Sequence, residues 1–160
     1  PTSPSLFNVL KLKNRIVDIR ADVRNLKKMI KIFKKYSPDY VFHLAAQPLV
    51  KRSYKNPLYT FTTNFLGSLN VLESLRVLNK KCVLIIITSD KSYRNSELKR
   101  GYKENDILGG DDPYSGSKAS VEIAINSYFQ FFIVFIRLCS IGINIFIKLS
   151  ESSSRINSSK

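Results

Sequence analysis

Residues 82–91 read Cys-Val-Leu-Ile-Ile-Ile-Thr-Ser-Asp-Lys, and this stretch decides the fold class. A continuous apolar run is typical of a parallel strand that is covered on both faces. The run ends abruptly in four polar residues, 88–91. We therefore expect a buried strand at 82–87 with polar side chains just beyond its carboxyl end.

Further strand patterns lie on both sides of this run. We expect strands at 15–19, 40–44 and 131–138. A helix capped by Asp22 should lie between the first two and stop at Ser37-Pro38. Its apolar positions, spaced by three and four, are Val23, Leu26, Ile30 and Phe33.

Two longer helices are expected further along the chain. Asn56-Pro57 is a cap and first-turn pair that opens a helix reaching about Leu78. Pro113 opens another helix that reaches about Gln130. The buried stripe expected on the first of these helices is Leu58, Phe61, Phe65, Leu69, Leu72 and Leu75.

Strands that alternate with helices predict a right-handed, doubly wound α/β sheet. Ligands of such folds bind outside the carboxyl ends of the strands. Polar residues follow Ile19, Leu44 and Ile87, so all three groups fall at such ends. We expect a partial Rossmann-like domain at 1–139, followed by an irregular, disordered tail at 140–160.

The chain of 160 residues carries a formal charge of +14. This excess could serve nucleic acid, a membrane surface or an anionic substrate such as a diphosphate. The basic residues are scattered, and no nucleic-acid-reading module accompanies them. We interpret them as solvated helix faces and expect no nucleic-acid partner. A non-catalytic module that binds RNA in a salt-sensitive way remains the alternative.

Cys82 and Cys139 lack the spacing of a metal site or disulfide framework, so both are expected to be reduced, with no metal bound. Residues 128–147 are mostly apolar, but Arg137 at their middle would cost about 2.5–3.5 kcal/mol in a bilayer. Gly142 and Asn144 also interrupt the stretch. We therefore expect a buried strand with a ragged continuation, no membrane partner and a cytoplasmic location.

Tyr114 and Lys118 are four residues apart near a helix start, which places them on one face. A lysine there stabilises a phenolate, so the tyrosine can act as a base. The same spacing also arises in an ordinary exposed helix pair. The preceding strand, however, ends near Ser89, and its hydroxyl could lie beside the tyrosine.

Ser89, Tyr114 and Lys118 match the catalytic triad of the short-chain dehydrogenase/reductase family, and the chain resembles its extended branch. Residues 43–48 are similar to the loop after the family's fourth strand, and 63–72 to its Thr-Asn-x-x-Gly helix. The resemblance implies NAD as cofactor. The implied cofactor contacts are Asp18, Ile19, Ala45, Ala46, Gln47, Thr63, Tyr114 and Lys118. His43 is expected to be a satisfied core histidine.

Residues 88–93 are similar to the segment of nucleotide-sugar 4,6-dehydratases that act on CDP-glucose, and residues 1–7, 46–50 and 101–105 also resemble that subfamily. The resemblance covers Pro1 to about Phe129. It implies a CDP-glucose substrate, an NAD-mediated internal redox cycle with loss of water, and a homo-oligomeric full-length form. The implied catalytic residues are Ser89, Asp90, Lys91, Tyr114 and Lys118. Another nucleotide-sugar epimerase or dehydratase is the alternative within the family.

No Gly-x-x-Gly-x-x-Gly loop, which binds pyrophosphate at a helix N-terminus, occurs in the sequence. Because the chain starts at Pro1 and its one methionine is Met29, we expect an internal piece of a longer protein. In the strand order 3-2-1-4-5, two missing strands leave a hole roughly 14 Å wide. The strand at 15–19 should therefore be displaced, and the isolated chain should show negligible dehydratase turnover.

Overall fold

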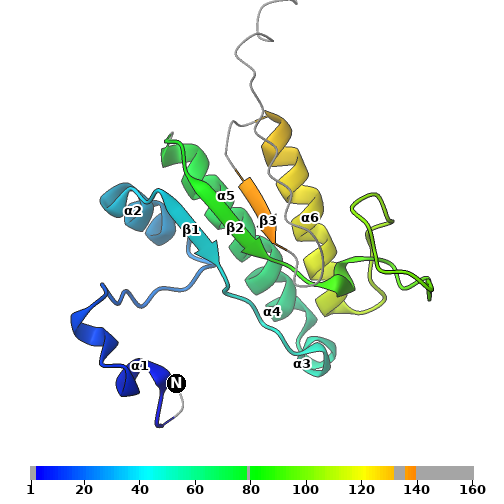
Figure 1. Ribbon diagram of the computed structural model, residues 1–160, viewed down its shortest axis with the longest axis horizontal. Coiled ribbons are helices and arrows are strands. Elements are labelled where there is room, and N and C mark those ends of the chain that lie inside the picture. Colours follow the sequence, from blue (N-terminus) through cyan, green and yellow to red (C-terminus); the bar gives the residue numbers. More distant parts are fainter. Residues whose placement is uncertain (1–2, 79, 132–135, 140–160) are drawn as a thin grey trace, which may run out of the picture.

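The computed structural model describes residues 3–78, 80–131 and 136–139. A small parallel sheet lies against helices, and an N-terminal segment extends away from it (Figure 1). The elements in chain order are α1 (Leu6–Val9), η1 (Leu12–Asn14), α2 (Leu26–Tyr36), β1 (Tyr40–His43), α3 (Val50–Lys55), α4 (Pro57–Phe61), the π-helical turn η2 (Thr62–Leu66), α5 (Gly67–Leu78), β2 (Val83–Ile87), η3 (Asp90–Ser92), α6 (Pro113–Phe131) and β3 (Ile136–Cys139).

The three strands are parallel and lie in the order β1-β2-β3. Val41 pairs with Leu84, and Leu84 pairs in turn with Ile136. The α/β fold class is confirmed, as are the strands expected at 40–44 and 82–87. The strand expected at 131–138 is represented by β3, whereas residues 132–135 and the expected tail at 140–160 lie outside the described residues.

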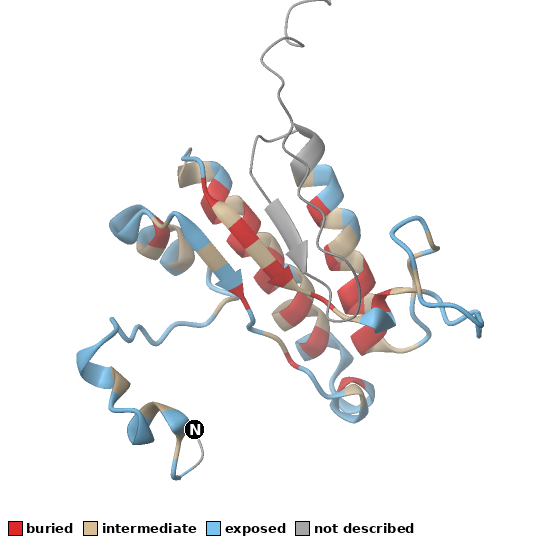
Figure 2. Cartoon of the chain, in the orientation of Figure 1, coloured by how far each residue is buried: buried red, intermediate tan, exposed pale blue. Residues whose placement is uncertain are grey.

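Helices α2, α5 and α6 supply the core on one face of this sheet. In β2, Leu84 and Ile86 are buried, whereas Val83, Ile85 and Ile87 are only half-buried. The expectation that this strand is covered on both faces is therefore only partly met: the face toward the helices is buried and the other is half-buried in the described part of the chain (Figure 2). The buried cluster consists of Phe33, Val71, Leu72, Leu75, Cys82, Leu84, Ile86, Val121 and Ile125.

The strand expected at 15–19 does not form. Arg15 lies in a turn, and Ile16 and Val17 are 52% and 69% exposed. A strand needs a neighbour to satisfy its backbone N–H and C=O groups. Among the described residues none pairs with this segment, which agrees with the expected displacement.

Helix α2 begins later than expected. Asn25, not Asp22, is its N-cap, and Asn25 Oδ1 accepts a 3.0 Å hydrogen bond from the Lys28 backbone N–H. The Asp22 carboxylate instead accepts from the backbone N–H of Arg24 at 2.9 Å. The helix ends before Ser37, which adopts a left-handed conformation with φ 42°, so the predicted stop is confirmed.

The helix expected from Asn56 to Leu78 is helical throughout but contains the π turn η2. A π turn inserts an extra residue, which rotates the faces on its two sides relative to each other. Leu72 and Leu75, beyond the turn, are buried as expected, but Leu58 before it is 77% exposed. The predicted stripe is therefore wrong at its start, and Asn56 makes no side-chain cap bond.

Candidate active site

The carboxyl end of β2 turns directly into the candidate site. Thr88 is buried, and Ser89 is the N-cap of the short helix η3. The Ser89 hydroxyl donates to Asp90 Oδ1 at 3.0 Å and accepts from the Lys91 backbone N–H at 3.2 Å. Asp90 and Lys91 themselves are exposed. This turn therefore presents one hydroxyl, one carboxylate and one ammonium group together.

Helix α6 places Tyr114 and Lys118 on one buried face, at 9% and 6% exposure. Asp112 fixes the start of this helix, because its Oδ1 accepts from the backbone N–H groups of Tyr114 at 2.9 Å and Ser115 at 3.0 Å. Its other oxygen accepts from Ser115 Oγ at 2.6 Å. The α6 start packs against η3. The tyrosine is thus held at a capped helix end beside the Ser89 turn.

Lys118 ties this helix to the strand end. Its Nζ donates a 3.0 Å hydrogen bond to the carbonyl oxygen of Ile87, the last residue of β2. Burial lowers the pKa of Lys118, and the negative charge of Glu122, one helical turn further along, opposes that effect. The ammonium group therefore contacts Ile87, which is two residues before Ser89. Lys118 itself follows Tyr114 by about one turn of the helix.

Glu122 was not predicted from the sequence, although its spacing of four from Lys118 was visible. Burial raises the pKa of its carboxyl group. The nearby Thr88 hydroxyl partly opposes this effect, although it makes no full hydrogen bond in the structure. The charge of Glu122 thus favours the protonated form of the buried lysine.

The loop after β1 is held by hydrogen bonds to Asn64. The Asn64 side chain accepts from the Gln47 backbone N–H at 2.7 Å and donates to the Gln47 carbonyl oxygen at 3.2 Å. Asn64 Nδ2 also donates to Ser117 Oγ at 3.0 Å, which donates in turn to the Tyr114 carbonyl oxygen at 2.7 Å. One buried amide therefore connects this loop to the helix that carries Tyr114.

The hydrogen-bonding roles of Asn64 and Ser117 were not predicted from the sequence, although Asn64 is the asparagine of the Thr-Asn-x-x-Gly segment. An asparagine inside a helix is also unfavourable unless its amide has a specific partner, and this was a second signal. The neighbouring Thr63 Oγ1 is buried without a hydrogen-bond partner. The hydroxyl groups of Thr88 and Ser92 are also buried without a hydrogen-bond partner. Three buried hydroxyl groups around this end of the sheet are therefore able to form further hydrogen bonds.

Gln47 is buried, and its side chain bonds both within its own loop and to helix α4. Its Nε2 donates to Thr60 Oγ1 at 3.1 Å and to the Leu49 carbonyl oxygen at 3.0 Å, while its Oε1 accepts from the Leu49 N–H at 2.7 Å. Ala45 is exposed and Ala46 half-buried, so these two residues form the open part of the loop.

His43, at the end of β1, is a satisfied core histidine as expected. Its Nε2 lies 2.9 Å from Ser68 Oγ. That hydroxyl donates its proton to the Asn64 carbonyl oxygen at 2.7 Å, so the imidazole nitrogen is the donor. Burial, and then the positive charge of Lys118, lowers the pKa of His43 to about 4.

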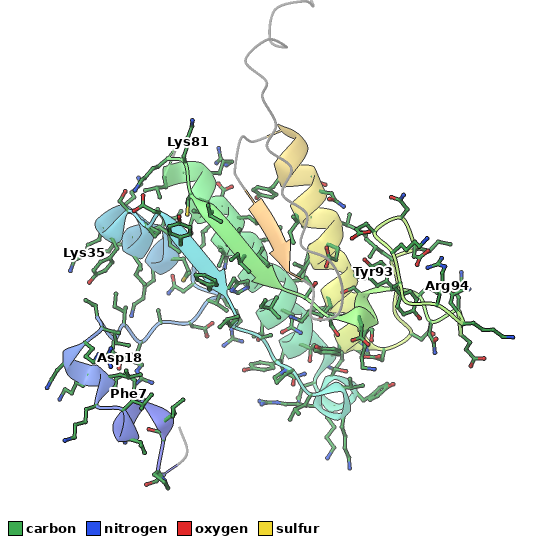
Figure 3. The ribbon with its side chains drawn as sticks, in the orientation of Figure 1. Phe7, Asp18, Lys35, Lys81, Tyr93 and Arg94 are labelled. Carbon is green, nitrogen blue, oxygen red and sulfur yellow. The ribbon has the colours of Figure 1, made fainter. Side chains whose placement is uncertain are left out.

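Asp18 and Ile19 are exposed on the extended N-terminal segment, and Asp18 forms a 2.7 Å ion pair with Arg20. Figure 3 shows Asp18 on the opposite side of the molecule from Tyr93, which follows η3. The structure therefore does not bring Asp18 together with the Ser89 turn. In a doubly wound fold these contacts serve opposite ends of a dinucleotide, so a separation is consistent with the expectation.

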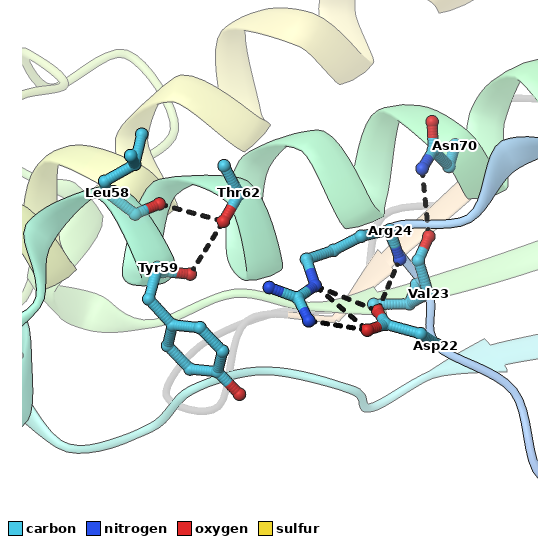
Figure 4. A network of polar contacts seen from close by, with 7 residues as sticks. All are labelled: Asp22, Val23, Arg24, Leu58, Tyr59, Thr62 and Asn70. Atoms are coloured by element: carbon cyan, nitrogen blue, oxygen red, sulfur yellow. Dashed lines mark hydrogen bonds and ion pairs between the residues drawn. The ribbon is translucent and has the colours of Figure 1, made fainter.

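The segment just after Asp18 is anchored to the α4–α5 helix. Asn70 Nδ2 donates to the Val23 carbonyl oxygen at 2.9 Å (Figure 4). Arg24 pairs with Asp22 at 2.6 Å and lies over the Tyr59 ring, 5.1 Å from its centroid. These contacts hold residues 22–24 in place, and no strand of the described residues lies in the same sheet as this segment.

The described residues contain no cluster of three or more histidine, cysteine, aspartate or glutamate side chains that could hold a metal. Within the same part of the chain, no helix has the length and apolar character needed to cross a bilayer. Cys82 is a buried free thiol, whereas the side chains of Arg137 and Cys139 lie outside the described part of the chain.

Comparison with known proteins agrees with this geometry. A family model described as GDP-mannose 4,6 dehydratase matches residues 5–145. The chain belongs to this family. CDP-glucose 4,6-dehydratase of Salmonella typhimurium is 39% identical over 128 residues, which are 80% of this chain and 36% of that protein. CDP-paratose 2-epimerase of Salmonella typhi is 30% identical over 129 residues, 71% of this chain and 38% of the relative.

Among solved structures, UDP-glucose 4-epimerase of Thermus thermophilus in complex with NAD superposes with a TM-score of 0.64 and 27% identity. The match covers 76% of this chain and 38% of that one. The family resemblance and the Rossmann-like fold are thereby confirmed. The chain spans little more than a third of the length of the relatives that it matches.

Proposed function

We propose that this chain carries the catalytic residues of an NAD-dependent nucleotide-sugar 4,6-dehydratase that acts on CDP-glucose. The supporting observation is the 3.0 Å hydrogen bond from Lys118 Nζ to the Ile87 carbonyl oxygen. It fixes the helix of Tyr114 against the strand that leads to Ser89. A phenol, an ammonium group and a hydroxyl are therefore carried by two elements that are bonded to each other.

The residues present suit one end of NAD better than the other. Thr63 offers a buried hydroxyl without a partner, and Ala45 and Ala46 leave the loop after β1 open. Tyr114 and Lys118 would hold the nicotinamide ribose. The pyrophosphate lacks its usual glycine-rich turn in this sequence, so these contacts are incomplete.

NAD would supply a hydride acceptor for the sugar C4 and later a donor to C6. The charge of Lys118 would stabilise the phenolate form of Tyr114, and this phenolate would remove the proton of the 4-hydroxyl group. Asp90 would protonate the departing 6-hydroxyl group as water is lost from C5 and C6. Lys91 would either exchange the C5 proton itself, removing it as water leaves and returning one to C5 when hydride reaches C6, or stabilise the charge that develops there while solvent exchanges that proton.

Asp90 and Lys91, directly after Ser89, favour a dehydratase over an epimerase, because water loss needs acid–base groups that a simple epimerisation at C4 does not. The Salmonella dehydratase at 39% identity supports CDP-glucose as substrate. Because the CDP-paratose 2-epimerase is also similar, at 30% identity, another reaction on a nucleotide sugar is the second candidate function.

Saturation-transfer NMR with NAD, CDP-glucose and UDP-glucose tests this proposal. We expect saturation transfer to CDP-glucose in preference to UDP-glucose. The Lys118→Met variant should lose this transfer. Tyr36→Phe, at the distant end of α2, is the control and should keep it. Turnover to the 4-keto-6-deoxy sugar by the isolated chain should be negligible. Equal transfer to both sugars would contradict the assigned substrate. Tight, salt-sensitive RNA binding without any sugar signal would favour the non-catalytic alternative.

A further inference from the structure

The net positive charge of the chain lies mostly in its first half. Residues 1–81 contain sixteen lysine and arginine residues and four acidic ones, so they carry +12 of the total formal charge of +14. Each of these four acidic side chains already forms an ion pair with a basic side chain. A charge asymmetry of this size between the two halves of a chain indicates an anionic macromolecular partner.

Helix α2 gathers five of these lysines on one surface. At 3.6 residues per turn they span an arc of roughly 120° around the helix. Like charges three and four residues apart repel one another, and α2 contains no acidic residue that would offset the repulsion. Lysines that are scattered in the sequence thus form one continuous surface. We call it the α2 ridge, and its five exposed members are Lys27, Lys28, Lys31, Lys34 and Lys35.

The ridge is rigid, and most of its charge is available to an anion. The opposite side of α2 packs against α5, with Phe33 in the buried cluster. Lys28 Nζ donates a 3.1 Å hydrogen bond to the Arg20 carbonyl oxygen, which joins the ridge to the preceding segment. The ammonium groups of three other ridge residues make no hydrogen bond or ion pair within the described part of the chain: Lys27, Lys31 and Lys34.

Exposed aromatic rings lie at the C-terminal end of the ridge. Tyr36, the last residue of α2, is 42% exposed, and Lys35 Nζ lies 5.2 Å from its ring centroid. Tyr40, which begins β1, is 67% exposed. Lys80 Nζ donates a 2.8 Å hydrogen bond to the Ser37 carbonyl oxygen, in the turn between the two rings. Basic side chains beside exposed rings suit single-stranded nucleic acid, because its phosphates attract lysine and its bases stack on aromatic rings.

We propose that the α2 ridge, together with Tyr36, binds single-stranded nucleic acid. A flexible strand can follow a surface on which the lysines point over a wide arc, whereas a flat bilayer contacts fewer of them. The apolar face of α2 is packed in the core, so it cannot enter a membrane. The expectation of no nucleic-acid partner rested on scattered basic residues, and the structure brings five of them together.

This surface is separate from the candidate active site. Figure 3 shows Lys35 on the opposite side of the molecule from Tyr93, which follows η3. The proposal therefore goes beyond the dehydratase function and does not depend on it. Binding of an oligonucleotide at the ridge should leave saturation transfer to CDP-glucose unchanged.

Fluorescence anisotropy of a short labelled oligo(U) at increasing KCl concentration tests the proposal. Five lysine–phosphate contacts predict a slope of about −3.5 for the logarithm of the binding constant against that of the salt concentration. The ridge variant replaces three exposed lysines: Lys27→Gln, Lys31→Gln and Lys34→Gln. The control variant removes the same charge from three exposed positions outside α2: Lys51→Gln, Lys55→Gln and Lys99→Gln.

The ridge variant should bind oligo(U) roughly tenfold more weakly or worse at low salt, with a slope about 2 less steep, because three phosphate contacts are lost. The control variant should bind nearly as well as the unaltered chain. Amide spectra of the free variants establish that both fold. Equal weakening in the two variants would mean that only net charge matters, and that result, or no binding at low salt, would overturn the proposal.

Two further measurements identify the ligand. Tyr36→Leu should weaken oligo(U) binding about fivefold or more, because a base loses its stacking partner. Tyr54→Leu is the matched control, since Tyr54 is 64% exposed but lies on α3. Equal binding by these two variants would contradict the proposal. Co-sedimentation with phosphatidylserine–phosphatidylcholine vesicles that the ridge variant abolishes, without any oligo(U) binding, would assign the ridge to a membrane surface and overturn the proposal.

Discussion

Lys118 Nζ donates a 3.0 Å hydrogen bond to the carbonyl oxygen of Ile87, so a buried lysine joins helix α6 to the end of strand β2. The lysine also lies close enough to His43 that its charge contributes to lowering the histidine pKa. The ends of β1 and β2 and the start of α6 are thus electrostatically connected, and this connection can be measured.

Lys118→Met should raise the pKa of His43 above its value of about 4, because the substitution removes a nearby positive charge. The pKa should stay below 6.5, since burial is the larger cause. His43 is the only histidine in the sequence, so an NMR titration reports it without ambiguity. Lys91→Met, at an exposed position, should leave the titration unchanged. An unaltered His43 pKa in Lys118→Met would show that the two groups are not coupled.

The stability of the fold should depend on pH through His43. Its pKa is lowered from 6.5 in the unfolded chain to about 4 in the folded one, so the unfolded state binds the proton more tightly. The contribution is complete above pH 6.5 and is lost as pH falls toward 4, amounting to up to about 3 kcal/mol. Urea unfolding at pH 7 and pH 4.5 measures this loss. A His43→Asn variant should lose correspondingly less stability over the same interval.

Asn64→Ala should destabilise the fold by about 2–4 kcal/mol. It leaves the buried N–H and carbonyl groups of Gln47 without their partners and removes the link to Ser117. Asn126→Ala is the matched control, because Asn126 is exposed on α6 and should change stability little. Urea unfolding gives the free energies, and faster amide exchange at Gln47 should accompany the loss. Similar free energies of unfolding for the two variants would show that the hydrogen bonds of Asn64 do not stabilise the fold.

Gly67→Ala should also destabilise the protein, by about 1–2 kcal/mol. A Cβ atom at this position would lie 2.8 Å from Val23 Cγ1, and this crowding exceeds the gain in helix propensity. In the double variant Gly67→Ala with Val23→Ala, the shortened side chain at position 23 no longer collides with the new Cβ atom. The loss of stability in the double variant should therefore be smaller than the sum of the two single losses. Gly116→Ala, whose Cβ would meet Phe61 Cζ at 3.4 Å and the Gly110 carbonyl oxygen at 3.9 Å, should be nearly neutral. Full additivity of the Gly67 and Val23 substitutions would contradict the contact.

Much of the fold could be predicted from local patterns, because its main elements have strong ones. The apolar run at 82–87 and Pro113 at a helix start both led to the correct elements. The strand at 15–19 could not be judged in this way, since strand formation requires a partner elsewhere in the chain. Burial of Leu58 was mispredicted for a related reason: no sequence pattern revealed the π turn that rotates it outward.

The candidate site was predicted to the same partial extent. Tyr114 and Lys118 share a buried helix face, as their spacing predicted. The position of Glu122 near Thr88 and the hydrogen bonds of Asn64 to Gln47 were missed, because these pairs lie on different elements and sequence spacing does not reveal such contacts. The catalytic and cofactor roles assigned to Ser89, Asp90 and Lys91, and to Asp18 and Ile19, remain predictions.

Chemical-shift mapping with CDP-glucose tests the central claim most directly. If the strand end and the helix start form one site, the backbone signals of Ser89, Tyr114 and Lys118 should shift together and saturate at the same ligand concentration. Shifts confined to the lysines of α2, and abolished by moderate salt, would instead mean that the sugar nucleotide meets only surface charge, and the proposed site would be wrong.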